Sequence, residues 1–201
     1  VLTGQLEKQL AETIDPDLGL RNLTRFVISS RSPISLGALI ERDEEALQIL
    51  LKVFSSSQYL SDLLVRDPES FDLIRLTEGQ PVTRQSLIDE LLAEIDFQSS
   101  NRVAMGAFRL FKHRETLRIA YGDWFRGISL ETTTQQLSYL AESIVQIAVK
   151  YCRHQFEKKV GVPRNHDGTE SRFCVFGMEG LGGQDLGYAN QIELFPVYEE
   201  A

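Results

Sequence analysis

Apolar residues recur three and four positions apart over most of the chain, which is the spacing that places them on one face of an α-helix. From Asp17 onward this pattern predicts a succession of helices, each introduced by a short polar residue that can cap it. Asp43 and Thr83 are predicted caps, because polar residues and then an apolar stripe follow each of them. Asp67 is a third, with Pro68 at the first helical position.

Two longer helices are predicted over residues 100–125 and 130–159, and Gly161 and Pro163 end the second of them. The apolar stripes of all these helices are typical of ordinary core packing. We therefore expect a helical N-terminal domain over residues 1–163.

The helix predicted over residues 100–125 carries the densest positive charge of the chain. Arg114 and Arg118 lie four apart in it, so that both side chains face the same neighbour. Such a pair could hold a phosphate group between two guanidinium planes. Alternatively, Glu115 and Asp123 neutralise the two arginines in surface ion pairs, which is the arrangement that we favour.

The pattern changes after Pro163, where a polar loop leads to an apolar run over residues 173–176 and a second run follows over 192–198. Both runs have the length and composition of strands. Strand, glycine turn, short helix and strand is an order found where a backbone approaches a phosphate. The pair Gly182 and Gly183 in the turn could equally serve to reach positive backbone dihedrals.

Polar residues alternate with apolar ones at the start of the second run. Gln191 and Glu193 alternate with Ile192 and Leu194, so period two predicts that both polar side chains share the face that points at the glycine turn. Two acidic residues so placed would hold a pair of magnesium ions on the phosphates of a nucleotide. In this chain the first of the two positions is an amide.

The composition is that of a globular protein. Among 201 residues there are 21 Lys and Arg against 29 Asp and Glu, a formal net charge of −8. Hydrophobic residues make up 42% and charged residues 25%, which excludes wholesale disorder. The acidic balance argues against a general affinity for nucleic acid or an anionic membrane surface.

Cellular context is also indicated by what the chain contains. No stretch approaches the ~18 uninterrupted apolar residues of a membrane span, so we expect a cytoplasmic protein. Cys152 and Cys174 lie in apolar segments without metal-ligand spacing, which predicts buried free thiols in a reducing compartment. Because the chain begins at Val1 and stops in an apolar run, we expect it to be a piece of a longer protein.

The C-terminal residues resemble the signature of a known family. The run that starts at Gly177 reads GMEGLGGQDLGYANQIELFPVY. It is similar to the signature of the glutamine synthetase adenylyltransferase/adenylyl-removing enzymes, also called glutamate-ammonia ligase adenylyltransferases, which reads approximately GMGKLGGRELNYSSDIDLIFLY. Upstream, the chain resembles the arginine-rich helix, ETT segment and long helix of that family through RLFKHRETLRIAYGDWFRGISLETTTQQLSYLAES, and its N-terminal helical region through LLKVFSSSQYLSDLLVRDPESFDLI. The order and spacing agree from about residue 20 to residue 199.

This resemblance implies a large bifunctional enzyme with two nucleotidyltransferase-fold halves, of which this chain is the N-terminal fragment. The implied fold class is mainly α with a small α+β part, in which residues 164–201 begin a truncated nucleotidyltransferase-like domain and contain its first two strands. The N-terminal half of such an enzyme removes AMP from a tyrosine of glutamine synthetase by phosphorolysis, giving ADP, and the C-terminal half attaches AMP from ATP. The implied cofactors are Mg²⁺ and an adenine nucleotide. Glutamine synthetase and a P-II signalling protein are the implied partners, glutamine is an effector, and neither nucleic acid nor membrane is involved.

The resemblance also implies site residues. Gly182 and Gly183 match the family glycines and are the implied nucleotide-binding residues. Gln191 and Glu193 stand where the family has its two strand aspartates and are the implied metal ligands, with Glu193 as the implied catalytic carboxylate. A third metal-binding aspartate is expected beyond residue 201.

Departures from the family form fall on the same site. Glu179 and Gly180 replace its Gly-Lys, which removes a cation and adds a carboxylate. Gln191 carries no charge, which weakens magnesium binding because hard dications depend on ligand charge. Pro196 interrupts the second strand, where it cannot donate to a ladder. Two hypotheses follow: an enzyme fragment whose activity needs the rest of the protein, or a noncatalytic nucleotidyltransferase-like module that binds a nucleotide or a partner protein. In both cases we expect the chain alone to be inactive.

Overall fold

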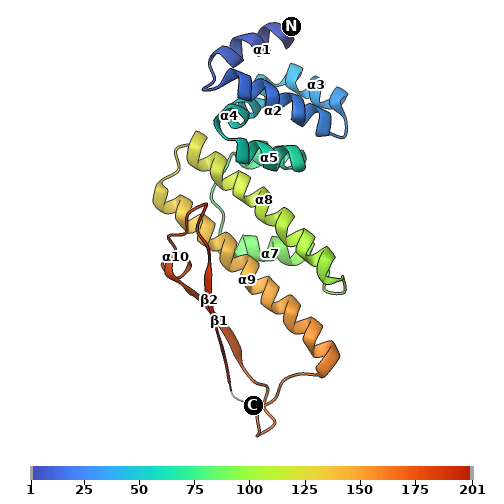
Figure 1. Ribbon diagram of the computed structural model, residues 1–201, viewed down its shortest axis with the longest axis vertical. Helices are drawn as coiled ribbons and strands as arrows, with labels where there is room; N and C mark the ends of the chain where they lie inside the picture. The colour runs from blue at the N-terminus through green and yellow to red at the C-terminus, as the bar shows by residue number, and fades with distance from the viewer. Residues whose placement is uncertain (1, 200–201) are drawn as a thin grey trace. The chain divides into compact units, whose positions relative to one another are not determined.

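A computed structural model describes residues 2–199 and shows a mainly helical chain with one small antiparallel sheet, which confirms the predicted fold class (Figure 1). The elements of this part of the chain are α1 (Leu2–Ala11), α2 (Pro16–Ser29), α3 (Pro33–Arg42), α4 (Glu44–Ser56), α5 (Gln58–Arg66), α6 (Ser70–Thr77), α7 (Arg84–Glu94), α8 (Asn101–Phe125), α9 (Leu130–Val160), β1 (Phe173–Met178), α10 (Glu179–Gly182) and β2 (Glu193–Tyr198). The chain divides into two compact units between Gly79 and Gln80. The predicted start of a nucleotidyltransferase-like domain at residue 164 stays a prediction.

The first unit contains α1 to α6 and has an aromatic core. The ring of Phe26 lies 5.4 Å from that of Phe54 and 6.0 Å from that of Phe71, between centroids. Asn22 is fully buried and donates from its side-chain amide to the carbonyl oxygen of Phe54 at 3.2 Å. Because a buried amide with a partner avoids the cost of an unpaired polar group, this contact fastens α2 to α4.

Local capping signals placed most helix starts correctly. Asp43 and Thr83 cap α4 and α7, and each side chain accepts a hydrogen bond from the backbone amide three residues further on. The prediction for Asp67 is wrong, because α6 begins only at Ser70. The amide of Asp67 donates to the carbonyl oxygen of Leu63, so this residue closes α5, and its carboxylate accepts the Ser70 hydroxyl at 2.6 Å.

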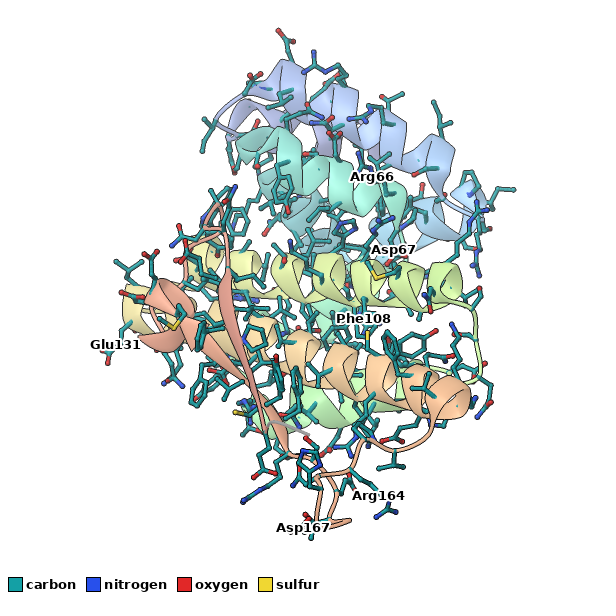
Figure 2. All side chains as sticks on the ribbon, turned by 60° about the horizontal axis from the view of Figure 1, so that its bottom comes forward. Arg66, Asp67, Phe108, Glu131, Arg164 and Asp167 are labelled. Atoms are coloured by element: carbon teal, nitrogen blue, oxygen red, sulfur yellow. The ribbon has the colours of Figure 1, made fainter. Side chains whose placement is uncertain are left out.

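The second unit is built on α7, α8 and α9. Phe108 lies between α8 and α9 (Figure 2), in a core that also takes up Leu181 and Leu186 from the C-terminal part of the chain. The longest predicted helix is confirmed, since α9 runs to Val160 and ends at Gly161, whose φ of 84° suits a residue without a Cβ atom.

The two strands pair with each other in antiparallel register. The amide of Glu199 donates to the carbonyl oxygen of Arg172 at 3.0 Å, so hydrogen-bonded pairs fall at every second position from this one. Pro196, which faces Val175, falls between two of these positions. Its nitrogen therefore points away from β1, and the ladder between the two strands loses no bond to the proline.

The burial predicted for the two cysteines is wrong. Both thiols are free and exposed. Cys174 lies in a two-stranded sheet whose β2 residues are all exposed, so apolar neighbours in the sequence do not produce burial there. Within the described residues, no helix is both long and apolar enough to cross a membrane.

Candidate functional site

The glycine turn begins directly at the end of β1, where α10 folds back on the strand. A Cβ atom added at Gly182 would lie 2.6 Å from the carbonyl oxygen of Gly177, and one added at Gly177 would lie 2.7 Å from the side chain of Leu181. Neither Gly182 nor Gly183 has a positive φ. Positive dihedrals are thus not the reason for this glycine pair. Gly182 is instead required because two backbone segments approach each other closely.

Positive φ values occur in this turn at residues that are not glycine. Glu179 has a φ of 48° and Gln184 a φ of 57°, a conformation that costs an ordinary residue roughly 1–2 kcal/mol. Glu179 stands at a position where the similar family signature has glycine. The turn therefore keeps the backbone conformation of a glycine-containing turn while it carries a carboxylate.

A second carboxylate lies at the same turn. Asp185 lies beside two glycines of the turn. A Cβ atom added at Gly180 or at Gly183 would in each case lie 3.3 Å from its Oδ1 atom. The amide of Asp185 donates to the carbonyl oxygen of Gly180 at 2.9 Å. With Glu179, two acidic residues thus stand where a phosphate-binding turn benefits from positive charge.

The segment after the turn is fastened to both long helices. The amide of Leu186 donates to the hydroxyl of Ser138 on α9 at 3.3 Å, and the side chain of Leu186 is buried in the core. The hydroxyl of Tyr188 donates to Oδ2 of Asp123 on α8 at 3.0 Å. Burial and the Asp123 carboxylate raise the pKa of the Tyr188 phenol well above its ordinary value, so this hydroxyl stays protonated and remains a donor.

The strand pairing brings one predicted site residue close to the turn. Glu193 is the first residue of β2 and pairs with Met178, which directly precedes α10. Gln191 lies two residues before β2 and, like Glu193, is exposed. The catalytic and metal-binding roles of Glu193 and Gln191, and the nucleotide-binding roles of the two glycines, stay predictions.

The residues present do not by themselves make up a magnesium site. Gln191 offers a neutral oxygen and Glu193 a single carboxylate, whereas magnesium is usually held by carboxylates in near-octahedral geometry. Over residues 2–199, no group of three or more His, Cys, Asp or Glu side chains gathers in a way that could hold a metal ion. Magnesium in nucleotide sites is commonly held by one or two carboxylates together with water and the phosphates of the nucleotide, so Glu193 and Gln191 could at most supply part of its ligands.

The arginine pair does not form a phosphate clamp. Arg118 is fully buried and donates to Glu115 at 2.7 Å and to Gln136 at 3.0 Å. Arg114 is mostly buried and pairs with Glu90 and Glu94 of α7, each at 2.7 Å. Both arginines thus form ion pairs, as the favoured alternative predicts. Two details of that prediction are wrong: the Arg118–Glu115 pair is buried rather than on the surface, and Asp123 accepts a hydrogen bond from Tyr188 instead of pairing with an arginine.

Three residues of the site were not found from the sequence: Ser138, Asp123 and Tyr188. Their contacts join positions 48 and 65 residues apart. No local pattern marks such a pair, because each of the three is an ordinary residue of its own helix or loop.

A groove of about 410 Å³ lies between α9 and the strands. Its apolar walls include Val145 and Val149 of α9 and Val175 and Leu194 of the strands, and Gly182 borders it at the turn. The β1–α10–β2 part thus packs the side chains of Leu181 and Leu186 against the helices and bounds an open groove along its strands.

Comparison with known proteins places these features in a family. Residues 47–201 match the family described as glutamate-ammonia ligase adenylyltransferase. Proteins named bifunctional glutamine synthetase adenylyltransferase/adenylyl-removing enzyme are similar to the chain: that of Psychromonas ingrahamii is 26% identical over 92% of the chain, that of Mannheimia haemolytica 30% over 78%, and that of Thioalkalivibrio sulfidiphilus 27% over 94%. These matches cover 20%, 17% and 19% of the relatives, so the chain spans about a fifth of their length. The chain belongs to the glutamate-ammonia ligase adenylyltransferase family.

Proposed function

We propose that this chain supplies the helical base and the glycine turn of a nucleotidyltransferase-like site in a bifunctional glutamine synthetase adenylyltransferase/adenylyl-removing enzyme. Such a site acts in nucleotidyl transfer to glutamine synthetase or in phosphorolytic removal of AMP from it, and so regulates nitrogen assimilation. Glutamine synthetase and a P-II signalling protein are the proposed partners, and an adenine nucleotide is the proposed ligand.

One observation supports this proposal: β1, α10 and the start of β2 lie together around the glycine turn. The close approach of Gly182 to Gly177 fixes α10 on β1. The pairing of Met178 with Glu193 then brings the proposed catalytic carboxylate to the end of the sheet where the turn lies. The family match over residues 47–201 includes this whole arrangement.

A second candidate function is a noncatalytic nucleotidyltransferase-like module that binds a nucleotide or a partner protein. The specific observation in its favour is the charge at the turn, where Glu179 and Asp185 stand and Gln191 brings no charge. Carboxylates repel phosphate oxygens, and an amide is a weak substitute for a metal-binding carboxylate. In this case the turn keeps its backbone conformation but does not catalyse nucleotidyl transfer.

A segment exchange separates the two candidates. The chain would replace the aligned segment of the Psychromonas ingrahamii relative, and phosphate-dependent ADP release from adenylylated glutamine synthetase would be measured. The enzyme proposal expects release with Gln191 in place. If ADP is released only after Gln191→Asp is combined with Glu179→Gly and Gly180→Lys, the result would instead support the noncatalytic module.

The exchange has its own control. The unmodified relative, and the relative in which the residues aligned with Gln191 and Glu193 are changed to Gln and Glu, give the upper and lower limits of release. Absence of release from every exchanged protein, in preparations that still bind glutamine synthetase, would count against the chain as part of an adenylyl-removing site.

A further inference from the structure

The segment between the glycine turn and β2, residues 183–192, contains Gln191 and connects the turn to Glu193 at the start of β2. It contains no helix or strand of its own. A segment without regular structure takes its position from contacts with a rigid scaffold, and otherwise samples many conformations. Strand pairing with Met178 already places Glu193, whereas Gln191 lies outside β2. The contacts with α8 and α9 therefore bear on the position of Gln191.

The contact with α9 is directional. The Ser138 hydroxyl donates its single proton to the carbonyl oxygen of Thr134 at 2.9 Å, which leaves an oxygen lone pair for the amide of Leu186. Ser138 is fully buried, so water does not compete for this lone pair. The position of the Leu186 amide is thus set by α9.

The contact with α8 lies two residues further along the segment. The Tyr188 hydroxyl donates a hydrogen bond to Asp123. Leu186, which lies between the turn and Tyr188, is buried in the core. Two contacts to two different helices fix a position and also a direction, which one contact cannot do. Beyond Tyr188, only Ala189 and Asn190 separate this fixed point from Gln191.

We propose that Ser138 and Asp123 are positioning residues of the nucleotidyltransferase-like site, which set the placement of Gln191 relative to the glycine turn through Leu186 and Tyr188. This inference rests on the proposed function for its relevance to nucleotidyl transfer. The hydrogen bonds of Ser138 and Asp123 reach Leu186 and Tyr188 of the segment. Each acts by holding the segment that carries Gln191.

The test uses the 201-residue chain and reads positions directly. Backbone amide chemical shifts of Gly182, Gly183 and Gln191 would be recorded by NMR for the wild type, S138A and D123A. We expect both variants to shift these resonances. S138A should also speed hydrogen exchange at the Leu186 amide about fivefold to tenfold, the effect of one lost hydrogen bond. Y188F would reproduce the shifts of D123A, and the two changes would not add.

A conservative variant separates positioning from charge. D123N keeps a carbonyl oxygen that can accept the tyrosine hydroxyl, so it should leave the three amide resonances in place. It removes the charge, so spectrophotometric titration should show a lower phenol pKa for Tyr188 than in the wild type. E131A, which removes an exposed carboxylate from the first turn of α9, is the control and should change neither reading.

Two outcomes would overturn the proposal: unchanged amide resonances in a folded D123A or S138A variant, or shifts of equal size in D123N and D123A. ADP binding by the wild-type chain is measured separately in the same spectra. If ADP does not bind, the proposed function is weakened while the positioning of Gln191 is still measured. S138A concerns a buried residue, so D123A and Y188F, which lie nearer the surface, keep the test valid if S138A does not fold.

Discussion

The second unit combines two regions that use their polar residues in opposite ways. In the helical region of α7, α8 and α9, Arg118 is buried and its guanidinium also donates to the backbone carbonyl of Gln80, next to Glu115 and Gln136. In the β1–α10–β2 region, Gln191 and Glu193 are exposed. Buried polar residues thus pair with one another in the helical region. In the β1–α10–β2 region the polar residues are open to solvent, where our proposal gives them a role in the reaction. Substitutions in the two regions should therefore differ in kind.

The largest effect is expected for Arg118→Ala. This change leaves the Glu115 carboxylate buried without its cation, which typically costs about 3–5 kcal/mol of unfolding free energy. The measurement is urea denaturation followed by circular dichroism. Arg118→Leu combined with Glu115→Leu is the matched control, because replacing a buried pair by apolar residues is often neutral. Equal losses for the single and double variants would contradict this account.

The helical region was largely predictable from the sequence, whereas the site was predictable only in part. Caps such as Asp43 and Thr83 act within three residues, so a linear pattern is enough to find them. The turn of β1 and α10 was predicted from its glycines. The contacts of Ser138 and Asp123 were not, because they depend on how distant segments pack together, and the same dependence made Arg118 look like a surface residue.

Gly182→Ala should give the next largest effect. It should disturb the packing of α10 on β1 and leave the helices unchanged. The new methyl group would stand 2.6 Å from a backbone carbonyl that cannot move away freely, which should cost about 1–3 kcal/mol. Gly183→Ala is the matched control, since its nearest neighbour, at 3.3 Å, is the flexible carboxylate of Asp185. Thermal unfolding and the amide spectrum of residues 177–186 would distinguish the two variants. If Gly183→Ala proves as damaging as Gly182→Ala, close approach is not the reason for the glycine.

Glu179→Gly should act in the opposite direction and stabilise the turn. It removes a left-handed conformation from a residue with a Cβ atom, a relief partly offset by the larger entropy of glycine in the unfolded chain. We expect a net gain of roughly 0.5–1 kcal/mol. Glu179→Ala keeps the Cβ atom and removes the charge, so it separates strain from electrostatics. A gain for alanine equal to that for glycine would show that charge is the cause.

The smallest effect is expected for Arg114→Ala, which sharpens the contrast with Arg118 one turn away. Arg114 is mostly buried, but the side chains of its partners Glu90 and Glu94 are 47% and 32% exposed, and an ion pair open to water in this way contributes at most about 1 kcal/mol. The loss should decrease as salt is added, because exposed charges are screened. A loss as large as that of Arg118→Ala, or one insensitive to salt, would remove the distinction between the two arginines.

The direction of the Pro196 nitrogen has a consequence for how further strands could pair with this sheet. A two-stranded sheet with exposed apolar residues could serve as a template for strands of other molecules. On β2 the outward position at residue 196 has no hydrogen to donate, and on β1 the outward carbonyl of Gly177 is covered by Gly182. Each edge thus lacks one bond that an added strand would require, so the sheet discourages fibril-like growth while its residues remain accessible.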